Sequence, residues 1–264
     1  MKLKSIIFAG LMALVTLPAM GQCKVVAHRG FWKTTAATTR ETATDAAQNS
    51  IRSLVKADSI DCYGSEFDTW ITPDGEIFVN HDPTINGYEI QSTPARVIRQ
   101  QLLPNGERIS TLDEYLAKGK ELKCMLICEL KSHKDKQQEK QAVQKILKLV
   151  KKHGLEDRMV YISFSYPGIR MLKAWAPKGT QCQYLNGELS PATLKKLGLD
   201  GLDYQTKVMR RHPNWFKEAH DLGLVVNVWT VNKVSDMKFC LDHGADIITT
   251  NEPQRLQQLI ATGK

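Results

Sequence analysis

Four short segments of the 264-residue chain place ionisable residues at or just past the end of an apolar, strand-like run. They are Ala27-His28-Arg29-Gly30, Glu66-Phe67-Asp68, His81-Asp82 and Glu129-Leu130-Lys131. Together they supply histidines, carboxylates, an arginine and a lysine, a set suited to binding a divalent metal and cleaving a phosphate ester. The order and spacing of the four segments carry this prediction, because each segment alone is weak evidence.

Three carboxylates, Glu66, Asp68 and Glu129, form a candidate metal site. Glu66 and Asp68 are two residues apart, so both side chains fall on one face of their strand. Carboxylates that face the inside of a fold need a cation to remain buried and charged. An all-oxygen site of this kind suits Ca²⁺ or Mg²⁺. The competing interpretation is solvated acids at strand ends, which the apolar flanking residues disfavour.

His28 and His81 are the candidate acid and base at a phosphodiester. One would activate the attacking oxygen and the other would protonate the leaving alkoxide, and both titrate near neutral pH. Arg29 offers a bidentate fork to phosphate oxygens and Lys131 a second positive charge. Arg29 and Lys131 can also pair with nearby carboxylates, and the two roles are compatible. The other histidines lie in polar or helical contexts and are predicted to be surface residues: His133, His153, His212, His220 and His243.

The elements that must position these residues alternate between apolar runs and helical patterns, which favours an α/β chain with parallel strands. Strands are expected over 25–28, 65–70, 77–81, 125–130, 160–164, 181–185, 201–204, 225–231 and 246–249. Helices are expected over 50–57, 111–117, 136–153, 166–175, 191–197, 213–222 and 234–243. Segments 31–47 and 83–106 read as loops, the second an insertion over one mouth of the fold.

This alternation predicts a single-domain TIM (β/α)₈ barrel with a small loop insertion. Active sites of such barrels lie at the C-terminal ends of the strands, where the four segments and Trp229 fall. Residues 1–21 read as a secretory signal peptide, with Lys2 and Lys4 before a short apolar run. The remaining domain, 22–264, has close to the roughly 250 residues of one barrel. We therefore expect an exported protein, periplasmic or extracellular.

Composition excludes several other classes of protein. The formal charge of +8 is a modest basic excess, and no nucleic-acid-binding motif accompanies it. No segment beyond the N-terminal one is apolar enough to span a membrane. Cys23 raises the alternative of a lipoprotein, which Gln22 before it disfavours. An oxidising compartment also permits a Cys23–Cys62 disulfide.

The chain resembles the glycerophosphodiester phosphodiesterases, a family related to bacterial phosphatidylinositol-specific phospholipases C. The matching motifs are Ala-His-Arg-Gly at 27–30, Gln-Asn-Ser at 48–50, Glu-x-Asp at 66–68, Thr-Pro-Asp-Gly and His-Asp within 72–82, Thr-Leu-Asp-Glu at 111–114, Glu-Leu-Lys at 129–131, Ser-Phe at 163–164, Trp-Thr-Val-Asn at 229–232 and Gly-Ala-Asp-Ile-Ile-Thr-Thr-Asn-Glu-Pro at 244–253.

The resemblance implies a TIM-type barrel that uses Ca²⁺ or Mg²⁺ to release an alcohol and glycerol 3-phosphate from a glycerophosphodiester, through a cyclic phosphate. It places the metal ligands on Glu66, Asp68 and Glu129 and the acid–base pair on His28 and His81. It places phosphate contacts on Arg29 and Lys131, and an aromatic contact to glycerol on Trp229.

One departure from the family pattern falls at Gln48, where the family usually has Glu. This residue cannot supply a carboxylate to the His28–Arg29 region, which puts a supporting contact there in question. Two alternatives stay open from the sequence. One is a lysophospholipid or glycerophosphoinositol substrate at the same site, and the other is a non-catalytic phosphate-ester-binding barrel.

Overall fold

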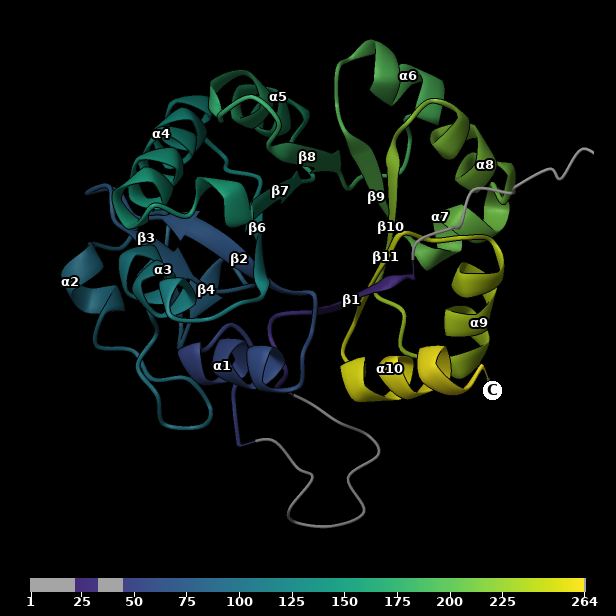
Figure 1. Ribbon diagram of the computed structural model, residues 1–264. Coiled ribbons are helices and arrows are strands. Elements are labelled where there is room, and N and C mark those ends of the chain that lie inside the picture. The colour runs from purple at the N-terminus through teal and green to yellow at the C-terminus, as the bar shows by residue number, and fades with distance from the viewer. Residues whose placement is uncertain (1–21, 33–44, 264) are drawn as a thin grey trace, which may run out of the picture.

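The computed structural model describes residues 22–32 and 45–263. Eight parallel strands form a closed barrel with helices around its outside (Figure 1). In barrel order they are β1 Lys24–Ala27, β2 Gly64–Ile71, β6 Met125–Leu130, β7 Met159–Ser163, β8 Gln181–Tyr184, β9 Gly201–Gln205, β10 Val225–Trp229 and β11 Ile247–Thr250. Strand β1 pairs with both β2 and β11, which closes the ring. The predicted TIM barrel is confirmed.

Helices follow the strands along the chain and cover the barrel. They are α1 Ile51–Ser59, α2 Ala95–Ile98, α3 Leu112–Lys120, α4 Lys136–His153, α5 Tyr166–Trp175, α6 Pro191–Lys196, α7 Thr206–Arg211, α8 Asn214–Asp221, α9 Val234–Asp242 and α10 Pro253–Thr262, with a 3₁₀ turn η1 at Glu156–Arg158. Each helix expected from periodicity is present within a few residues. Helices α2, α7 and α10 were not expected.

Local sequence signals set where several helices begin and end. The Ser50 hydroxyl accepts from the Ser53 amide at the start of α1, and Thr111 and Glu114 form a capping box at the start of α3. Such caps satisfy amides that the first turn leaves unpaired. Gly154 ends α4 in the left-handed conformation that glycine adopts without a Cβ penalty.

Alternation along the strands divides the apolar residues between two layers. Outward-facing side chains such as Leu202 and Tyr204 pack in the main core under the helices. Inward-facing ones such as Ile127 and Ile162 form a smaller cluster inside the barrel. The inside of the barrel is therefore filled at its centre, and functional side chains are positioned at the C-terminal strand ends.

The segment 83–106, expected to be a loop, is instead a folded insertion. Strand β3 (Ile77–Val79) runs antiparallel to β2, and β4 (Thr84–Ile85) pairs with β5 (Tyr88–Glu89) in a hairpin before α2. The insertion has its own apolar cluster. Its elements are two to four residues long, too short to give a readable period. Of the other expected loop, residues 33–44 lie outside the described residues.

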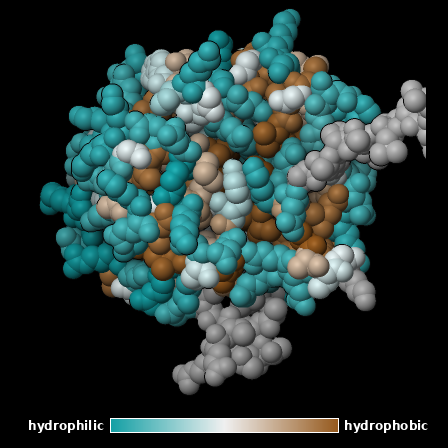
Figure 2. Space-filling view, viewed as in Figure 1, coloured by the Kyte–Doolittle hydropathy of each residue, from teal (hydrophilic) through white to brown (hydrophobic). Residues whose placement is uncertain are grey.

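The surface is hydrophilic over most of the face in Figure 2, with apolar residues gathered toward its middle. None of the helices in the described part of the chain is long and apolar enough to cross a membrane. All six cysteines are free thiols, so the Cys23–Cys62 disulfide considered from the sequence is absent.

Candidate active site

The turn after β1 has an uncommon backbone that aims His28 and Arg29 at the barrel mouth. Arg29 has φ +59° and Gly30 has φ +77°. A Cβ at position 30 would lie 2.3 Å from the Ser53 hydroxyl, so this position requires glycine. The Ser53 hydroxyl donates to the Arg29 carbonyl at 3.1 Å. Non-glycine residues with positive φ are often found at functional sites, where contacts with the surrounding structure hold the unfavourable backbone conformation in place.

Glu66, Asp68 and Glu129 form the acidic cluster that their spacing predicts. Asp68 on β2 is in register with Glu129 on β6, and one oxygen from each carboxylate lies within 4.8 Å of the others. The three residues are 2%, 1% and 7% exposed. Oε1 of Glu66 has no hydrogen-bond partner among the described residues.

This cluster fits a divalent cation on its own chemistry. Burial and the charges of Asp68 and Glu129 raise the pKa of Glu66 well above its ordinary value. Burial and the charge of Asp68 raise the pKa of Glu129 to about 8. Like charges this close cannot all ionise without a cation, and hard oxygen donors favour Ca²⁺ or Mg²⁺.

Two cationic side chains border the acidic cluster. Lys131 Nζ lies 3.2 Å from Asp68 Oδ1 and 2.9 Å from Glu129 Oε1, and Arg29 Nε lies 3.8 Å from Asp68 Oδ2. Although burial alone would raise the pKa of Asp68, the charges of Lys131 and other cationic neighbours outweigh it and lower that pKa. Arg29 and Lys131 thus approach the carboxylates and still line the pocket, so both roles considered from the sequence are compatible with the geometry.

The two histidines have different environments. His28 Nδ1 lies 2.8 Å from the amide oxygen of Asn251, and its Nε2 lies 4.0 Å from Glu66 Oε2. Burial and the charge of Arg29 lower the pKa of His28 to about 4. His81 Nδ1 lies 2.7 Å from the Asp82 carboxylate, and the His81 ring is partly exposed. Burial lowers the pKa of His81 as well.

These side chains meet in one pocket of about 110 Å³ at the C-terminal end of the barrel. Its charged side carries six residues: His28, Arg29, Glu66, His81, Glu129 and Lys131. Its other side is apolar and carries Ile162, Phe164, Leu185 and Trp229, with Asp203 and Thr249 alongside. Trp229 packs edge-on against Phe164, with ring centroids 5.4 Å apart. Apart from Asp68 in the adjoining acidic cluster, every site residue expected from the sequence lines this pocket.

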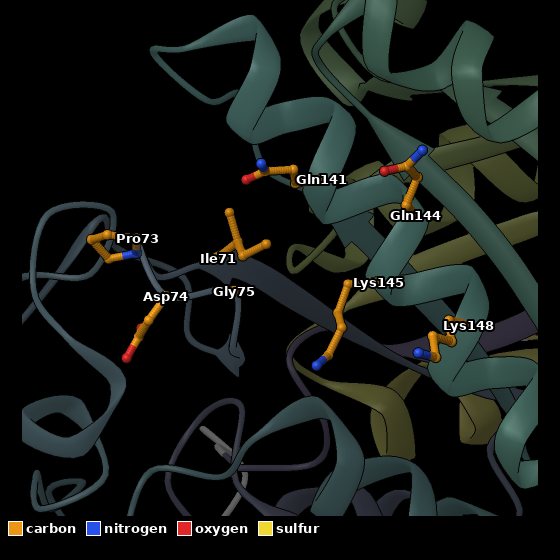
Figure 3. Close-up of a pocket in the computed structure, with 8 residues that line it drawn as sticks. All are labelled: Ile71, Pro73, Asp74, Gly75, Gln141, Gln144, Lys145 and Lys148. Atoms are coloured by element: carbon orange, nitrogen blue, oxygen red, sulfur yellow. The ribbon is translucent and has the colours of Figure 1, made fainter.

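A larger pocket, of about 410 Å³, lies outside the barrel between the turn after β2 and helix α4 (Figure 3). Asp74 is an acid on its rim, but its carboxylate is held by the Thr72 hydroxyl at 2.6 Å and the Ala95 amide at 3.0 Å. The lysines that line it, Lys145 and Lys148, project from α4. This pocket has neither the acidic cluster nor a histidine, so the barrel pocket is the candidate active site.

Supporting amides form the part of the site that sequence reasoning missed. Asn49 Nδ2 donates to Asp68 Oδ2 at 2.8 Å, and its Oδ1 accepts from the Asp68 amide at 3.1 Å. Asn251 holds His28. Gln48 Oε1 accepts from Arg29 Nη1 at 2.7 Å, so the supporting contact questioned from the sequence is made by an amide. The only sequence signal for these residues is their position within the Gln-Asn-Ser and Thr-Asn-Glu-Pro motifs.

Four histidines expected on the surface are instead partly buried: His133, His153, His212 and His220. His133 Nδ1 lies 2.7 Å from the Lys131 carbonyl, and its ring packs against Trp70. His153 Nε2 lies 2.7 Å from the Asp113 carboxylate. His220 Nε2 lies 3.1 Å from the Asp246 carboxylate, and the His212 ring stacks on Trp215. The partners of His153 and His220 lie 40 and 26 residues away in sequence, so local context does not reveal them.

The barrel, the buried carboxylates and the paired histidines define a phosphoric diester hydrolase. The chain belongs to the glycerophosphoryl diester phosphodiesterase family, whose model matches residues 28–255. A glycerophosphodiester phosphodiesterase of known structure from Parabacteroides distasonis is 42% identical, with 92% of this chain and 98% of that chain covered and a TM-score of 0.86.

More distant relatives extend the same likeness. A glycerophosphodiester phosphodiesterase from Caldanaerobacter subterraneus subsp. tengcongensis is 25% identical over 262 residues, which is 90% of this chain and 98% of the relative. An Oleispira antarctica phosphodiesterase, solved with the product sn-glycerol-3-phosphate, is 21% identical. The match covers 90% of this chain and 97% of that chain, with a TM-score of 0.76, and the two proteins share the fold.

Proposed function

We propose that this protein is a metal-dependent glycerophosphodiester phosphodiesterase that releases an alcohol and glycerol 3-phosphate. The observation that carries the proposal is the juxtaposition, in one pocket, of a buried acidic cluster with two histidines and two cations. Family membership supports the reaction, and the product bound to the Oleispira antarctica relative supports glycerol 3-phosphate as the product.

His28 is the general base in this proposal. An amide oxygen only accepts hydrogen bonds, so the contact to Asn251 keeps the proton on His28 Nδ1 and leaves Nε2 as an acceptor. A lowered pKa keeps the ring neutral near pH 7. Nε2 takes the proton from the glycerol hydroxyl beside the ester as that oxygen attacks phosphorus.

His81 is the general acid. Its Nδ1 faces the Asp82 carboxylate, which stabilises the protonated ring. Its partial exposure gives it room to reach the leaving oxygen at the mouth. His81 donates a proton as the bond from phosphorus to the alcohol breaks, which leaves a cyclic phosphate. Water then opens the cyclic phosphate with the two histidines in reversed roles, giving glycerol 3-phosphate.

Besides a base and an acid, the reaction requires groups that stabilise the negative charge on the phosphoryl oxygens. Arg29 presents a planar fork and Lys131 a point charge at the pocket, so both bind non-bridging oxygens. Glu66, Asp68 and Glu129 would hold Ca²⁺ or Mg²⁺. When bound, the ion supplies further electrostatic stabilisation of the phosphoryl oxygens. Trp229 packs against the glycerol carbons.

The test is release of glycerol 3-phosphate from glycerophosphocholine with Ca²⁺, with Mg²⁺ and with a chelator. We expect metal-dependent release that His28→Ala and His81→Ala each reduce by roughly 10²–10⁴-fold, the usual contribution of acid–base catalysis. His243→Ala, at an exposed histidine that follows the last residue of α9 and does not line the pocket, is the matched control and should retain activity. Near wild-type rates in either active-site variant would contradict the assignment.

The same assay separates the two alternative functions. If the protein hydrolyses a lysophospholipid or glycerophosphoinositol and not glycerophosphocholine, the proposed site stands and only the assigned substrate changes. Binding of phosphate esters without turnover of any of them would indicate a non-catalytic barrel.

We also propose that residues 1–21 are removed as a signal peptide and that the mature domain, 22–264, is exported to the periplasm or the medium. The N-terminal lysines and short apolar run of the sequence support this, and the segment itself lies outside the described residues. The test is the mass of the protein recovered from each cell fraction. An intact N-terminus in the cytoplasm would contradict the proposal.

A further inference from the structure

Asp203 is an acid that the mechanism above does not use. It lies on β9, where Leu202 and Tyr204 point outward into the main core, so the side chain of Asp203 points into the barrel. It is 1% exposed and lines the same pocket as His28 and Trp229. Its place on the apolar side of the pocket separates it from the acidic cluster on β2 and β6.

The carboxyl group of Asp203 lacks the partners that buried acids normally have. Among described residues its Oδ1 has no hydrogen-bond partner, and no lysine, arginine or histidine pairs with it. Its backbone carbonyl accepts from Trp229 Nε1 at 2.9 Å, which leaves the carboxyl group unengaged by that contact. Burial, with no opposing charge, raises the pKa of Asp203 well above its ordinary value. An unpaired buried carboxyl group is costly to the fold, and a neutral one can both donate and accept.

Neighbouring polar residues inside the barrel are already paired with each other. Asn227 Nδ2 donates to Gln183 Oε1 at 3.3 Å, and the Thr249 hydroxyl donates to Asn227 Oδ1 at 3.2 Å. Asn227 is the register partner of Asp203, yet its amide bonds elsewhere. Among the described residues that line this side of the pocket, the buried side-chain atom without a partner is Asp203 Oδ1, and it is available to a ligand.

We propose that Asp203 recognises the terminal hydroxyl of the glycerol moiety, the one remote from the phosphate. The inference rests on the proposed function and deepens it. Arg29 and Lys131 place the phosphoryl group at the charged side, and His28 there takes the hydroxyl beside the ester. The glycerol carbons then extend along Trp229 and Phe164, and the third oxygen meets Asp203.

This contact selects for glycerophosphodiesters with a free terminal hydroxyl. A lysophospholipid carries an acyl chain on that oxygen, so it cannot donate to Asp203 and must place the chain in a pocket of about 110 Å³. A site whose buried polar group is left unpaired discriminates more strongly than an apolar pocket does. Asp203 thus disfavours the lysophospholipid alternative.

The experiment compares two substrates that differ only at this position. Glycerophosphocholine has the terminal hydroxymethyl group, and 2-hydroxyethyl phosphocholine lacks it while keeping the hydroxyl beside the ester. For the wild type we expect kcat/KM on glycerophosphocholine to be roughly tenfold or more above that on the analogue. Asp203→Ala should lose roughly tenfold on glycerophosphocholine and little on the analogue.

Two further variants distinguish recognition from structural support. Asp203→Asn keeps a donor and an acceptor in the same shape, so it should recover most of the preference for glycerophosphocholine. Ile162→Val, a neutral change on the same wall, should alter both substrates by a similar factor. Equal losses on both substrates in Asp203→Ala would overturn the proposal, since they indicate a structural role.

A binding measurement keeps this test independent of turnover. Calorimetry with glycerol 3-phosphate and with 2-hydroxyethyl phosphate, on wild type and Asp203→Ala, reports recognition of the same hydroxyl. A wild type that prefers glycerol 3-phosphate through Asp203 without hydrolysing any diester would sustain this inference while refuting the proposed function. Equal binding of the two phosphates by the wild type would overturn the inference even if glycerophosphodiesters are hydrolysed.

Discussion

Arg29 is held by Gln48 through a hydrogen bond from Nη1 to the side-chain amide oxygen, 2.7 Å long. The amide orients the guanidinium and does not neutralise it, so the charge remains available to a phosphoryl group. The same arginine has a positive φ and donates its backbone amide to Glu66 Oε2 at 2.8 Å. Its position is thus set from both the main chain and the side chain.

Removing this support should weaken substrate binding. Gln48→Ala takes away a hydrogen bond to a charged group, worth about 1.5–3 kcal/mol, so we expect kcat/KM to fall roughly tenfold or more, with KM raised more than kcat is lowered. Gln48→Glu is the matched control: it keeps an acceptor that orients Arg29, so it should retain more activity than Gln48→Ala. Unchanged kinetics in Gln48→Ala would mean that Arg29 needs no side-chain support.

The partner of His28 should control the pH dependence of the reaction. In Asn251→Asp a carboxylate replaces the amide oxygen 2.8 Å from Nδ1, which stabilises the protonated ring and raises the pKa of His28 from about 4 by roughly 1 unit or more. Below the new pKa the base is protonated, so the acid limb of the kcat/KM profile moves to higher pH. Asn251→Ala should lower the rate without that upward move. An acid limb at the same pH in all three proteins would remove His28 from the role of base.

Metal affinity should rise with pH. The pKa of Glu129 is raised to about 8 without metal, so below that pH a cation must displace a proton from the cluster. For each displaced proton the affinity for Ca²⁺ or Mg²⁺ increases about tenfold per pH unit. Calorimetry in buffers of different ionisation enthalpy measures both the affinity and the released proton. Glu129→Gln should bind weakly with a flatter pH profile, whereas a flat wild-type profile would show the carboxylates already ionised.

The buried carboxyl group of Asp203 should lower the free energy of unfolding at neutral pH. Its pKa is raised in the folded state, so between the unfolded value, about 3.9, and the folded value the native protein holds more protons than the unfolded chain. The free energy of unfolding of the wild type therefore falls as pH rises through this window. Asp203→Asn should melt at a higher temperature than wild type, with a difference that is small near about pH 4 and grows toward pH 7. A variant less stable at every pH would show that the carboxyl group supports the fold.

The sequence predicted the barrel and the acidic cluster because both rest on short-range periodicity. Glu66 and Asp68 share a face through their spacing alone, and the β2–β6 pairing then adds Glu129. The folded insertion was not predicted because strands as short as β4 and β5 contain too few residues to show an alternation of apolar and polar side chains. Asn251 was missed because its partner lies at the other end of the chain, and only the β1–β11 register brings them together.

Asp203 shows the same limit in another form. A single acid in a short apolar run gives no indication of whether it faces solvent, a salt bridge or a pocket. Its role depends on which strand face is inward and on which described charged side chains lie beside it, and both are properties of the closed barrel.

Closure of the ring between β1 and β11 also sets the order in which the site is completed. The residue that holds the His28 ring, Asn251, comes 223 residues later in the chain than His28 itself. A growing chain therefore carries every carboxylate of the acidic cluster long before it carries the residue that orients His28. Removal of β11 and the residue after it would therefore leave the His28 ring without this partner, although β11 lies more than two hundred residues from His28 in sequence.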